Sequence, residues 1–394
     1  MSVLTINGGS SSIKFALFEQ VEPPVRGLFG EVERIGLADG TISASGVKGA
    51  LAKDEPFVVH DLEEAGGALI DWLGRRADFG AIAGVGHRIV HGGPRFRSAR
   101  LVTQEVIEEL RRIAPLDPAH LPGEIALLRA FLDRVPGVAH VACFDTAFHA
   151  DLPRVAQLLP VPRRYEAAGV RRYGFHGLSY TYLMSELERV AGPEVAQGRV
   201  VLAHLGSGAS MAAVRGGKCV DTTMAFTPTA GLMMGTRSGD LDPGLLIHLM
   251  RTEQLTADQL DDLVNRRSGL LGVSGSSSDM KYLLDREASD PSAADAVALF
   301  CYEARKFAAA MAAAAGGLDT LVFAGGIGER AAPIRARIAD GLAHLGVRVD
   351  QARNAAGAPI ISPDDNPVTV RVIPTDEELV IARETLAVER AGRG

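Results

Sequence analysis

Three glycine-rich turns have the composition of phosphate-binding loops. They lie at residues 7–12, 206–210 and 325–329, and each directly follows an apolar run that is typical of a buried strand. Turns of this kind can direct successive backbone N–H groups at one anion, and serine hydroxyls add further donors. One such turn is usually only a turn, but three of them favour nucleotide binding.

Four other residues suit the transfer of an anionic group, although each has a simpler explanation. Arg88 lies in a strand pattern and could pair with a surface acid, and Asp145 ends the apolar run 138–144, where it either caps a turn or binds a ligand. His176 could be a hydrogen-bonded core histidine. Arg237 lies in a loop between glycines, where packing gives little reason for an arginine.

Two histidines flank Arg88 with a spacing that resembles a helical metal site. His87 and His91 are four residues apart, but Ile89 and Val90 followed by two glycines favour a strand over a helix. We therefore reject a metal site at this position.

The common nucleotide motifs are absent. Nothing in the chain matches Gly-x4-Gly-Lys-Ser/Thr, and residues 325–328 lack the spacing of a dinucleotide-binding fingerprint. The phosphates must be held in another way, and a dehydrogenase is excluded.

Length and composition limit the class of protein. The 394 residues exceed what one core usually supports, and the first two glycine turns each join two strand-like runs, which indicates a duplicated domain. With 41 basic and 48 acidic residues, a net charge of −7 and no dense basic run, binding to nucleic acid or an anionic membrane is disfavoured.

The three separated cysteines are expected to be buried thiols. We expect no leader, because a strand pattern begins by Val3 without a charged and apolar segment before it. The Ala-rich run 307–315 is shorter than the about 18 residues that span a bilayer, so we expect a cytoplasmic protein.

The elements that carry these residues follow from periodicity. We expect helices at 104–112, 123–133, about 294–315 and from Thr375 onward, the last with a capping box of Thr375 and Glu378. The proline-rich passage 151–162 is the best candidate for a domain crossing, so we place a boundary near residue 150.

Six segments together resemble the acetate kinase family, from residue 4 to about 385. They are residues 7–14, 86–93, 144–149, 173–177, 234–239 and 374–378. The resemblance implies an α/β fold with two duplicated domains of the actin, sugar-kinase and Hsp70 (ribonuclease H-like) type and an active site in the interdomain cleft. It also implies an acceptor-side domain at 1–150, a nucleotide-binding domain at 151–377, a last helix (about 378–394) that packs back on the first domain, and a homodimer.

The implied activity is a phosphotransferase with a carboxyl group as acceptor. The family transfers phosphate reversibly between ATP and acetate, with Mg²⁺ and with Mn²⁺ as an alternative, giving acetyl phosphate and ADP. The nearest rival is the same chemistry on propionate. A non-catalytic nucleotide-dependent switch is a rival of another class, but it would not need Arg88, Asp145, His176 and Arg237 together.

The resemblance also implies a role for each site residue. Arg88 would bind the acceptor carboxylate, Asp145 would position the attacking group or the magnesium, and His176 and Arg237 would stabilise the transition state. Asn7 and Glu377 would lie near the metal, although an acid is favoured in a first helical turn whatever its function. The acceptor's methyl group would contact Val90, Leu116, Phe175 and Pro228. The nucleotide would contact Ser10, Ser12, Lys14, His204, Leu205, Gly206, Ser207, Gly208, Asp279, Met280, Lys281, Gly326, Ile327, Gly328, Glu329 and Arg330.

Three positions depart from the family pattern. Asp117 stands where the family has histidine, while Ser207 and Arg330 each stand in place of asparagine. Because a carboxylate beside a carboxylate substrate is costly, we expect Asp117 to turn away and bind a cation such as a neighbouring arginine, or His120 to act as a substitute donor, or both.

Overall fold

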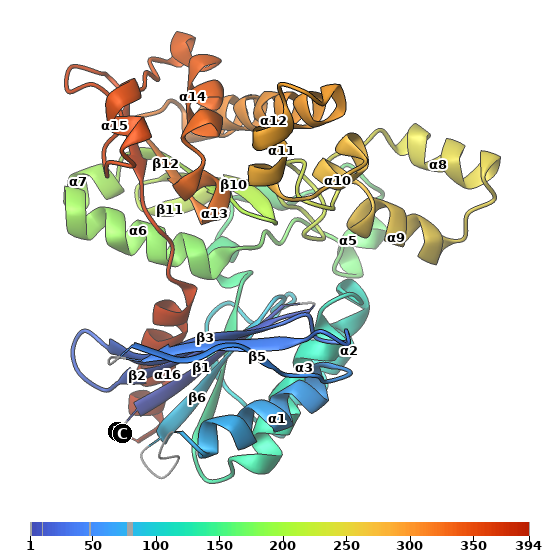
Figure 1. Ribbon diagram of the computed structural model, residues 1–394, viewed down its shortest axis with the longest axis vertical. Coiled ribbons are helices and arrows are strands. Elements are labelled where there is room, and N and C mark those ends of the chain that lie inside the picture. Colours follow the sequence, from blue (N-terminus) through green and yellow to red (C-terminus); the bar gives the residue numbers. More distant parts are fainter. Residues whose placement is uncertain (1, 10, 47–48, 77–81, 394) are drawn as a thin grey trace. The chain divides into compact units, whose positions relative to one another are not determined.

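The computed structural model describes residues 2–9, 11–46, 49–76 and 82–393. Contacts divide the chain into two compact units (Figure 1). Unit 1 comprises Met1–Ala150, Gly177–Tyr182 and Asp376–Gly394, and unit 2 comprises Asp151–His176 and Leu183–Thr375. The domain limits predicted from the sequence stay a prediction, and the units differ from them in assigning 177–182 and 376–377 to unit 1.

Unit 1 is built on an eight-stranded sheet. The strand order is β5-β4-β3-β2-β1-β6-β8-β7, and β6 is parallel to both of its neighbours. The strands are β1 (Ser2–Gly8), β2 (Ile13–Glu19), β3 (Val25–Glu33), β4 (Thr41–Gly46), β5 (Gly49–Pro56), β6 (Ile82–Ile89), β7 (Arg100–Leu101) and β8 (Ala139–Phe144). The helical segments are α1 (Leu62–Gly74), α2 (Gln104–Ile113), η2 (Ala114–Leu116), α3 (Leu121–Arg134), η3 (Ala147–His149), the first turns of α6 (Gly177–Ala191) and α16 (Glu377–Arg393).

Helices cover both faces of this sheet. Leu4 and Ile6 of β1 join the core with Leu69 of α1 and Phe131 of α3, whereas Val3 faces a second core on α16. Because both faces of β1 are buried, its sequence is a continuous apolar run and not an alternating one. The sheet is therefore the middle layer of three, with α1 and α3 on one side and α16 on the other (Figure 1).

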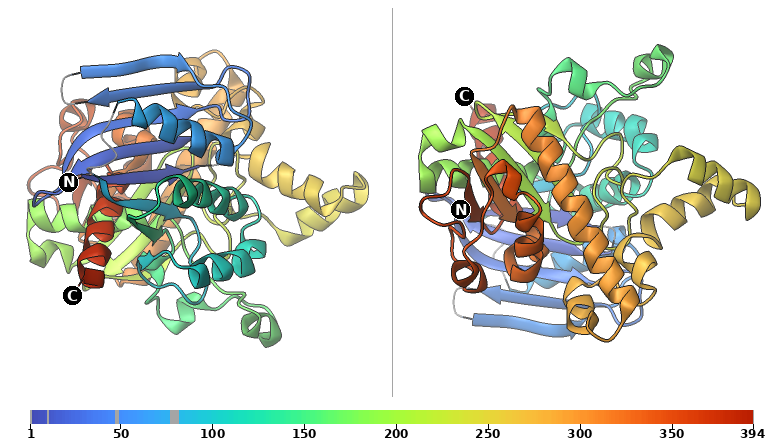
Figure 2. Two further views of the ribbon diagram at one scale, coloured as in Figure 1. Left: turned by 90° about the horizontal axis from the view of Figure 1, so that it is seen from below. Right: turned by 90° about the horizontal axis from the view of Figure 1, so that it is seen from above.

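Unit 2 is built on a five-stranded sheet with the order β11-β10-β9-β12-β13. The strands are β9 (Arg199–Leu205), β10 (Ala209–Arg215), β11 (Lys218–Thr222), β12 (Thr320–Ala324) and β13 (Thr369–Val372). The helical segments are α4 (Arg154–Gln157), α5 (Arg163–Ala167), the rest of α6, α7 (Pro193–Ala196), α8 (Pro243–Thr252), α9 (Ala257–Arg266), α10 (Gly269–Ser274), α11 (Met280–Arg286), α12 (Pro291–Ala315), α13 (Gly325–Arg330), α14 (Ala332–Asp340), η4 (Ala343–Leu345) and α15 (Gln351–Ala355). The long helix α12 packs on β9 and β10, and the α8–α9 hairpin projects from the rest of unit 2 in both views of Figure 2.

The two sheets repeat one topology. In unit 1, β3-β2-β1-β6-β8 pair as antiparallel, antiparallel, parallel and parallel. In unit 2, β11-β10-β9-β12-β13 pair in the same sequence of directions. The duplication predicted from two similar glycine turns is confirmed, because β1–β2 and β9–β10 are the equivalent hairpins.

Most predicted elements are confirmed, and one helix start is wrong. The structure has α2, α3, α12 and β8 within a few residues of the expected limits. The last helix begins later than predicted, because Asp376 and not Thr375 caps it, with the Asp376 carboxylate accepting from Leu379 N at 3.0 Å. The three cysteines are buried, as expected. No helix in the described ranges is long and apolar enough to span a membrane.

The packing of α16 on β6 depends on a glycine. A Cβ at Gly86 would collide with the side chains of Thr385 and Ile381, both of which are fully buried on α16. We predict that Gly86→Ala lowers the free energy of unfolding by about 1–3 kcal/mol, the usual cost of overpacking. Urea unfolding measures this difference.

Gly392→Ala, near the end of α16, is the control, because nothing lies within 4 Å of a Cβ at that position. An equal effect of the two substitutions would contradict the close packing of α16 on β6.

Candidate active site

Arg88 and Asp145 meet at one edge of the unit 1 sheet. Arg88 lies near the end of β6, and Asp145 directly follows β8, the parallel neighbour of β6. The Arg88 Nε and Nη2 atoms donate to Asp145 Oδ2 at 3.1 and 2.6 Å. Parallel strands carry their carboxyl ends to the same edge, so the topology forces this pair together.

The Arg88 guanidinium is almost fully used by protein acceptors. Its Nη1 donates to the Gly8 carbonyl at 2.9 Å and to Glu124 Oε1 at 3.1 Å. Four of its five N–H groups therefore have partners among the described residues. If Arg88 is to donate two hydrogen bonds to a substrate carboxylate, Asp145 or Glu124 must first give up a hydrogen bond to it.

Glu124 on α3 is a site residue that sequence reasoning missed. Its side chain is 3% exposed, and Oε2 accepts from Val90 N at 2.8 Å. Burial raises the pKa of Glu124 to about 7, against the opposing charge of Arg88. The available signal was the spacing of 121, 124, 125 and 128, which places a carboxylate within the apolar stripe of the helix.

Asn7 and Glu377 also come together in unit 1, from opposite ends of the chain. Asn7 Nδ2 donates to Glu377 Oε2 at 3.0 Å and to Glu378 Oε1 at 3.3 Å. Burial, and then the charge of Asp145, raises the pKa of Glu377 to about 7. Asn7 and Glu377 were the two residues predicted to lie near a metal.

The oxygen donors in this region fit a magnesium ion. Asp145 Oδ1 is buried and has no hydrogen-bond partner among the described residues, and Asn7 and Glu377 supply further hard oxygen atoms. Within those residues, no group of three or more His, Cys, Asp or Glu side chains forms a metal site. Mg²⁺ usually takes one or two carboxylates and completes its shell with water and substrate phosphates.

Unit 2 brings together His176, Gly208 and Arg237. His176 has a left-handed backbone (φ 58°), which is uncommon for a residue other than glycine. Its Nδ1 lies 2.8 Å from the Ser210 hydroxyl, and its ring lies 4.4 Å from that of His204. A Cβ at Gly208 would lie 3.2 Å from His176 Nε2 and 3.6 Å from Arg237 Nη2, so both predicted stabilisers lie close to the turn between β9 and β10.

The loop of Arg237 is tied to the same turn. Gly235 N donates to the Ser207 carbonyl at 2.9 Å, and Arg237 Nη1 donates to the Pro228 carbonyl at 2.8 Å. Arg237 is thus positioned by Pro228, one of the residues predicted to contact the acceptor. Each of these bonds lies within unit 2.

The third glycine turn, at the start of α13, is stabilised by hydrogen bonds with the side chains of Glu329 and Arg335. Glu329 Oε1 accepts from Gly325 N and Thr375 N, both at 3.0 Å. Arg335, which is 1% exposed, donates from Nη1 to the Gly328 and Glu329 carbonyls at 2.9 Å. Sequence reasoning missed Arg335 because a buried arginine looks no different from a surface one on a short helix.

The other predicted nucleotide contacts lie in several places. Ser10 lies outside the described residues. Ser12 and Lys14 flank the start of β2, and the Ser12 carbonyl accepts from Gly9 N at 2.7 Å. Asp279 caps α11, and the next two residues are buried Met280 and exposed Lys281. Leu205 ends β9 and Gly206 follows it, while Ile327 lies within α13. Arg330 ends α13 and is exposed, and Gly326 has open space around a Cβ.

The four predicted acceptor contacts are divided between the units. Buried Val90 and partly buried Leu116 belong to unit 1, and buried Phe175 and Pro228 belong to unit 2. The roles of all these site residues stay predictions.

The departure at Asp117 is resolved locally. Asp117 is buried, and its Oδ1 lies 2.9 Å from His120 Nδ1. The partner is therefore His120 and not the arginine given as an example. Asp117 Oδ2 is also buried and has no hydrogen-bond partner among the described residues.

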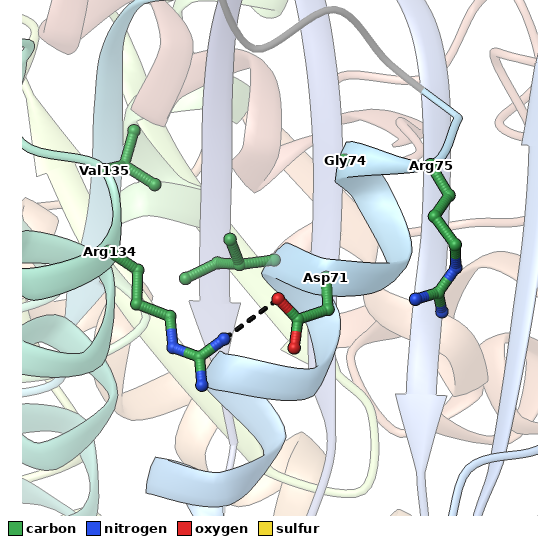
Figure 3. Close-up of a pocket in the computed structure, with 6 residues that line it drawn as sticks. Asp71, Gly74, Arg75, Arg134 and Val135 are labelled. Atoms are coloured by element: carbon green, nitrogen blue, oxygen red, sulfur yellow. Dashed lines mark hydrogen bonds and ion pairs between the residues drawn. The ribbon is translucent and has the colours of Figure 1, made fainter.

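A separate hollow lies at the far end of α3. It is lined by Ile70, Asp71, Gly74, Arg75, Arg134 and Val135. Figure 3 shows Arg134 directed at Asp71, with 2.9 Å between the bonded atoms. Position 134 is ten residues from Glu124 along α3, or about 15 Å. None of the predicted site residues lines this hollow.

The duplicated sheet and its glycine turns define a two-domain α/β protein of the actin and sugar-kinase type. The chain belongs to the Acetokinase family, whose profile matches residues 2–383. This confirms the resemblance drawn from six short segments.

Individual relatives match over their full length. An acetate kinase of Rhodopseudomonas palustris strain TIE-1 is 44% identical, covering 99% of both chains, and a propionate kinase of Citrobacter rodentium is 43% identical, covering 99% of this chain and 97% of its own. The crystal structure of Porphyromonas gingivalis acetate kinase aligns with a TM-score of 0.87 at 36% identity, over 98% and 99% of the two chains. A propionate kinase structure from Francisella tularensis aligns with a TM-score of 0.91 at 33% identity, with the same coverage.

The raised pKa of Glu377 gives a prediction about stability and pH. The folded protein holds a proton that the unfolded chain releases at lower pH, so this group stabilises the fold below its unfolded pKa of about 4.5, and that contribution is lost as the pH rises through about 7. Glu377→Gln cannot ionise. We expect its stability relative to wild type to increase by about 1–3 kcal/mol between pH 5 and pH 8, measured by urea unfolding at several pH values.

Glu109→Gln is the control, because Arg112 lowers the pKa of Glu109 and that carboxylate does not titrate in this range. A stability difference between Glu377→Gln and wild type that is constant with pH would show that Glu377 is not held protonated.

Proposed function

We propose that this chain is an acetate kinase, which transfers the γ-phosphoryl group of ATP reversibly to acetate and gives acetyl phosphate and ADP. The observation that carries the proposal is the full-length similarity to acetate kinases at 44% identity. The Arg88–Asp145 pair in unit 1 and the His176–Arg237 group in unit 2 support it, because an acyl acceptor and a transferring phosphoryl group each need fixed donors.

The proposed reaction is a single in-line displacement. A carboxylate oxygen of the acid forms a bond to the γ-phosphorus while the bond to the bridging oxygen breaks, and that oxygen leaves with ADP. Acetate is already ionised at neutral pH, so the attacking group has no proton to remove. Arg88 orients the acid, while Arg237 and His176 donate to oxygens that gain charge in the transition state.

Asn7, Asp145 and Glu377 would hold Mg²⁺ or Mn²⁺. The ion, when bound, neutralises the phosphate charge of ATP. Two observations support this assignment. One buried oxygen of Asp145 has no hydrogen-bond partner among the described residues. The hydrogen-bonded side chains of Asn7 and Glu377 add amide and carboxylate oxygens. The nucleotide contacts are assigned to the turns at Gly206 and Gly326.

Propionate is the second candidate acceptor, because propionate kinases are among the relatives at 43% identity. We assign the acid's alkyl group to Val90, Leu116, Phe175 and Pro228. One extra methylene changes the binding free energy only modestly, so we expect acetate to be preferred over propionate by about 10–200-fold. The three buried and widely separated cysteines support a reducing compartment, and we place the enzyme in the cytoplasm.

A coupled assay of ADP release tests this function. We expect turnover with acetate, less with propionate and butyrate, and none without an acid. Arg237→Ala should lower kcat by about 10²-fold with ATP binding retained, since its donor acts on transition-state charge. Arg348→Ala, which removes an exposed arginine that pairs with Asp365 and Asn366, should keep wild-type turnover.

ATP turnover that is independent of any acid would support the nucleotide-dependent switch and contradict the kinase. A less than few-fold effect of Arg237→Ala would remove that residue from the catalytic group.

We also propose that the enzyme is a homodimer that uses the α8–α9 hairpin. No α8 side chain is buried, and Leu245, Ile247 and Met250 are exposed apolar residues on this helix. Ile247 and Met250 are three residues apart and therefore share one side of the helix. An exposed apolar side is costly in water, and the usual dimer covers it with the same side of a second copy.

Ile247→Glu should convert the dimer to a monomer, because a buried unpaired carboxylate at a self-complementary interface is destabilising. Light scattering after size exclusion measures the mass. Val190→Glu places the same charge at an exposed apolar position on α6 and should leave the mass unchanged. If the Ile247→Glu protein is still a dimer, this side of α8 is not the dimer interface.

A further inference from the structure

Glu124 makes more contacts than its place in the α3 core requires. One carboxylate oxygen accepts from the Arg88 guanidinium at 3.1 Å, and the other accepts from Val90 N at 2.8 Å. Arg88 and Val90 are two residues apart at the end of β6. A single buried side chain thus joins the cation and the backbone of an apolar residue that are both assigned to the acceptor.

Charge balance does not explain Glu124. Asp145 already accepts two hydrogen bonds from Arg88 and neutralises its charge. A second carboxylate at 3% exposure adds a buried negative charge, and an apolar residue in the stripe of α3 would avoid that cost. The position therefore needs an explanation other than stability.

The surroundings of Glu124 disfavour its ionised form overall, because burial outweighs the groups that stabilise the carboxylate. Arg88 of β6 and His120, at the start of α3, oppose the effect of burial, whereas Asp117 adds to it, and the net pKa is about 7. Both neighbouring groups, Arg88 Nη1 and Val90 N, are donors. Only the carboxylate can accept from both without placing an O–H group against one of them.

We propose that Glu124 is a positioning residue for the acceptor acid, fixing the Arg88 guanidinium and the Val90 backbone relative to each other. The distance between the cation and the apolar wall then sets the length of acid that is preferred. This inference rests on the proposed function, because it assumes that Arg88 and Val90 contact the acid.

Glu124→Gln tests the proposal. The amide can satisfy only one of the two donors and turns its NH₂ group toward the other. We expect the KM for acetate to rise by about 10–100-fold, as for loss of a hydrogen bond to a charged group. The KM for ATP should change less than twofold and kcat less than about fivefold, and the preference for acetate over propionate should narrow.

A pH profile separates positioning from a purely structural role. In wild type, kcat/KM for acetate should fall below about pH 7, where Glu124 takes up a proton. Glu124→Gln should lose the part of this fall that Glu124 causes, and the part that remains belongs to Glu377, whose pKa is also raised to about 7. Glu109→Gln removes another Glu–Arg pair of unit 1, that with Arg112, and should keep both the KM for acetate and the profile of wild type.

Glu124→Asp keeps the charge but shortens the side chain by one methylene, so it cannot reach both donors without strain. It should raise the KM for acetate and keep the fall in kcat/KM at low pH. If Glu124→Gln does not fold, as judged by thermal unfolding, the KM values of Glu124→Asp for acetate and for ATP decide the question.

A wild-type KM for acetate in a folded Glu124→Gln or Glu124→Asp protein, or equal increases for acetate and ATP, would overturn the inference. Absence of acid-dependent ADP release in wild type would instead overturn the proposed function, whatever the variants do.

Discussion

The burial of one guanidinium constrains the chemistry of unit 1. Burial alone would lower the pKa of Arg88, but the charges of Asp145 and Glu124 outweigh that effect and raise it. Asp145, which directly follows β8, neutralises the cation and accepts two hydrogen bonds from it. Removing Asp145 would leave the guanidinium charge less well compensated, which is among the more destabilising changes in a protein interior.

Unit 2 uses the same strand order for different chemistry. Its hairpin turn at Gly208 is in contact range of a histidine ring and an arginine, whereas the equivalent end of β1 in unit 1 presents the Gly8 carbonyl to Arg88. The left-handed His176 and the absence of a side chain at Gly208 keep donors close to the backbone. The two units thus share one strand order, but the residues near their turns differ. Unit 1 has acidic side chains there, and unit 2 has hydrogen-bond donors.

Sequence patterns predicted what depends on local order. The strand runs, the glycine turns and the place of Asp145 at the end of a buried strand follow from apolar periodicity. The hydrogen bonds between Arg88 and Asp145 were not predicted, because they depend on the parallel pairing of β6 with β8. Glu124 and Arg335 were missed because their partners lie far away in the chain, and their residue types are usually exposed. The cap of α16 was assigned one residue early, since threonine and aspartate stand side by side and both can accept from a backbone N–H.

The most direct test is to observe the product of the reaction by phosphorus NMR. With ATP, acetate and Mg²⁺, acetate kinase activity should give acetyl phosphate and ADP in equal amounts before any inorganic phosphate appears. ADP with inorganic phosphate and no acyl phosphate at any time would contradict phosphoryl transfer to a carboxylate, and the chain would then be an ATP hydrolase or a nucleotide-dependent switch.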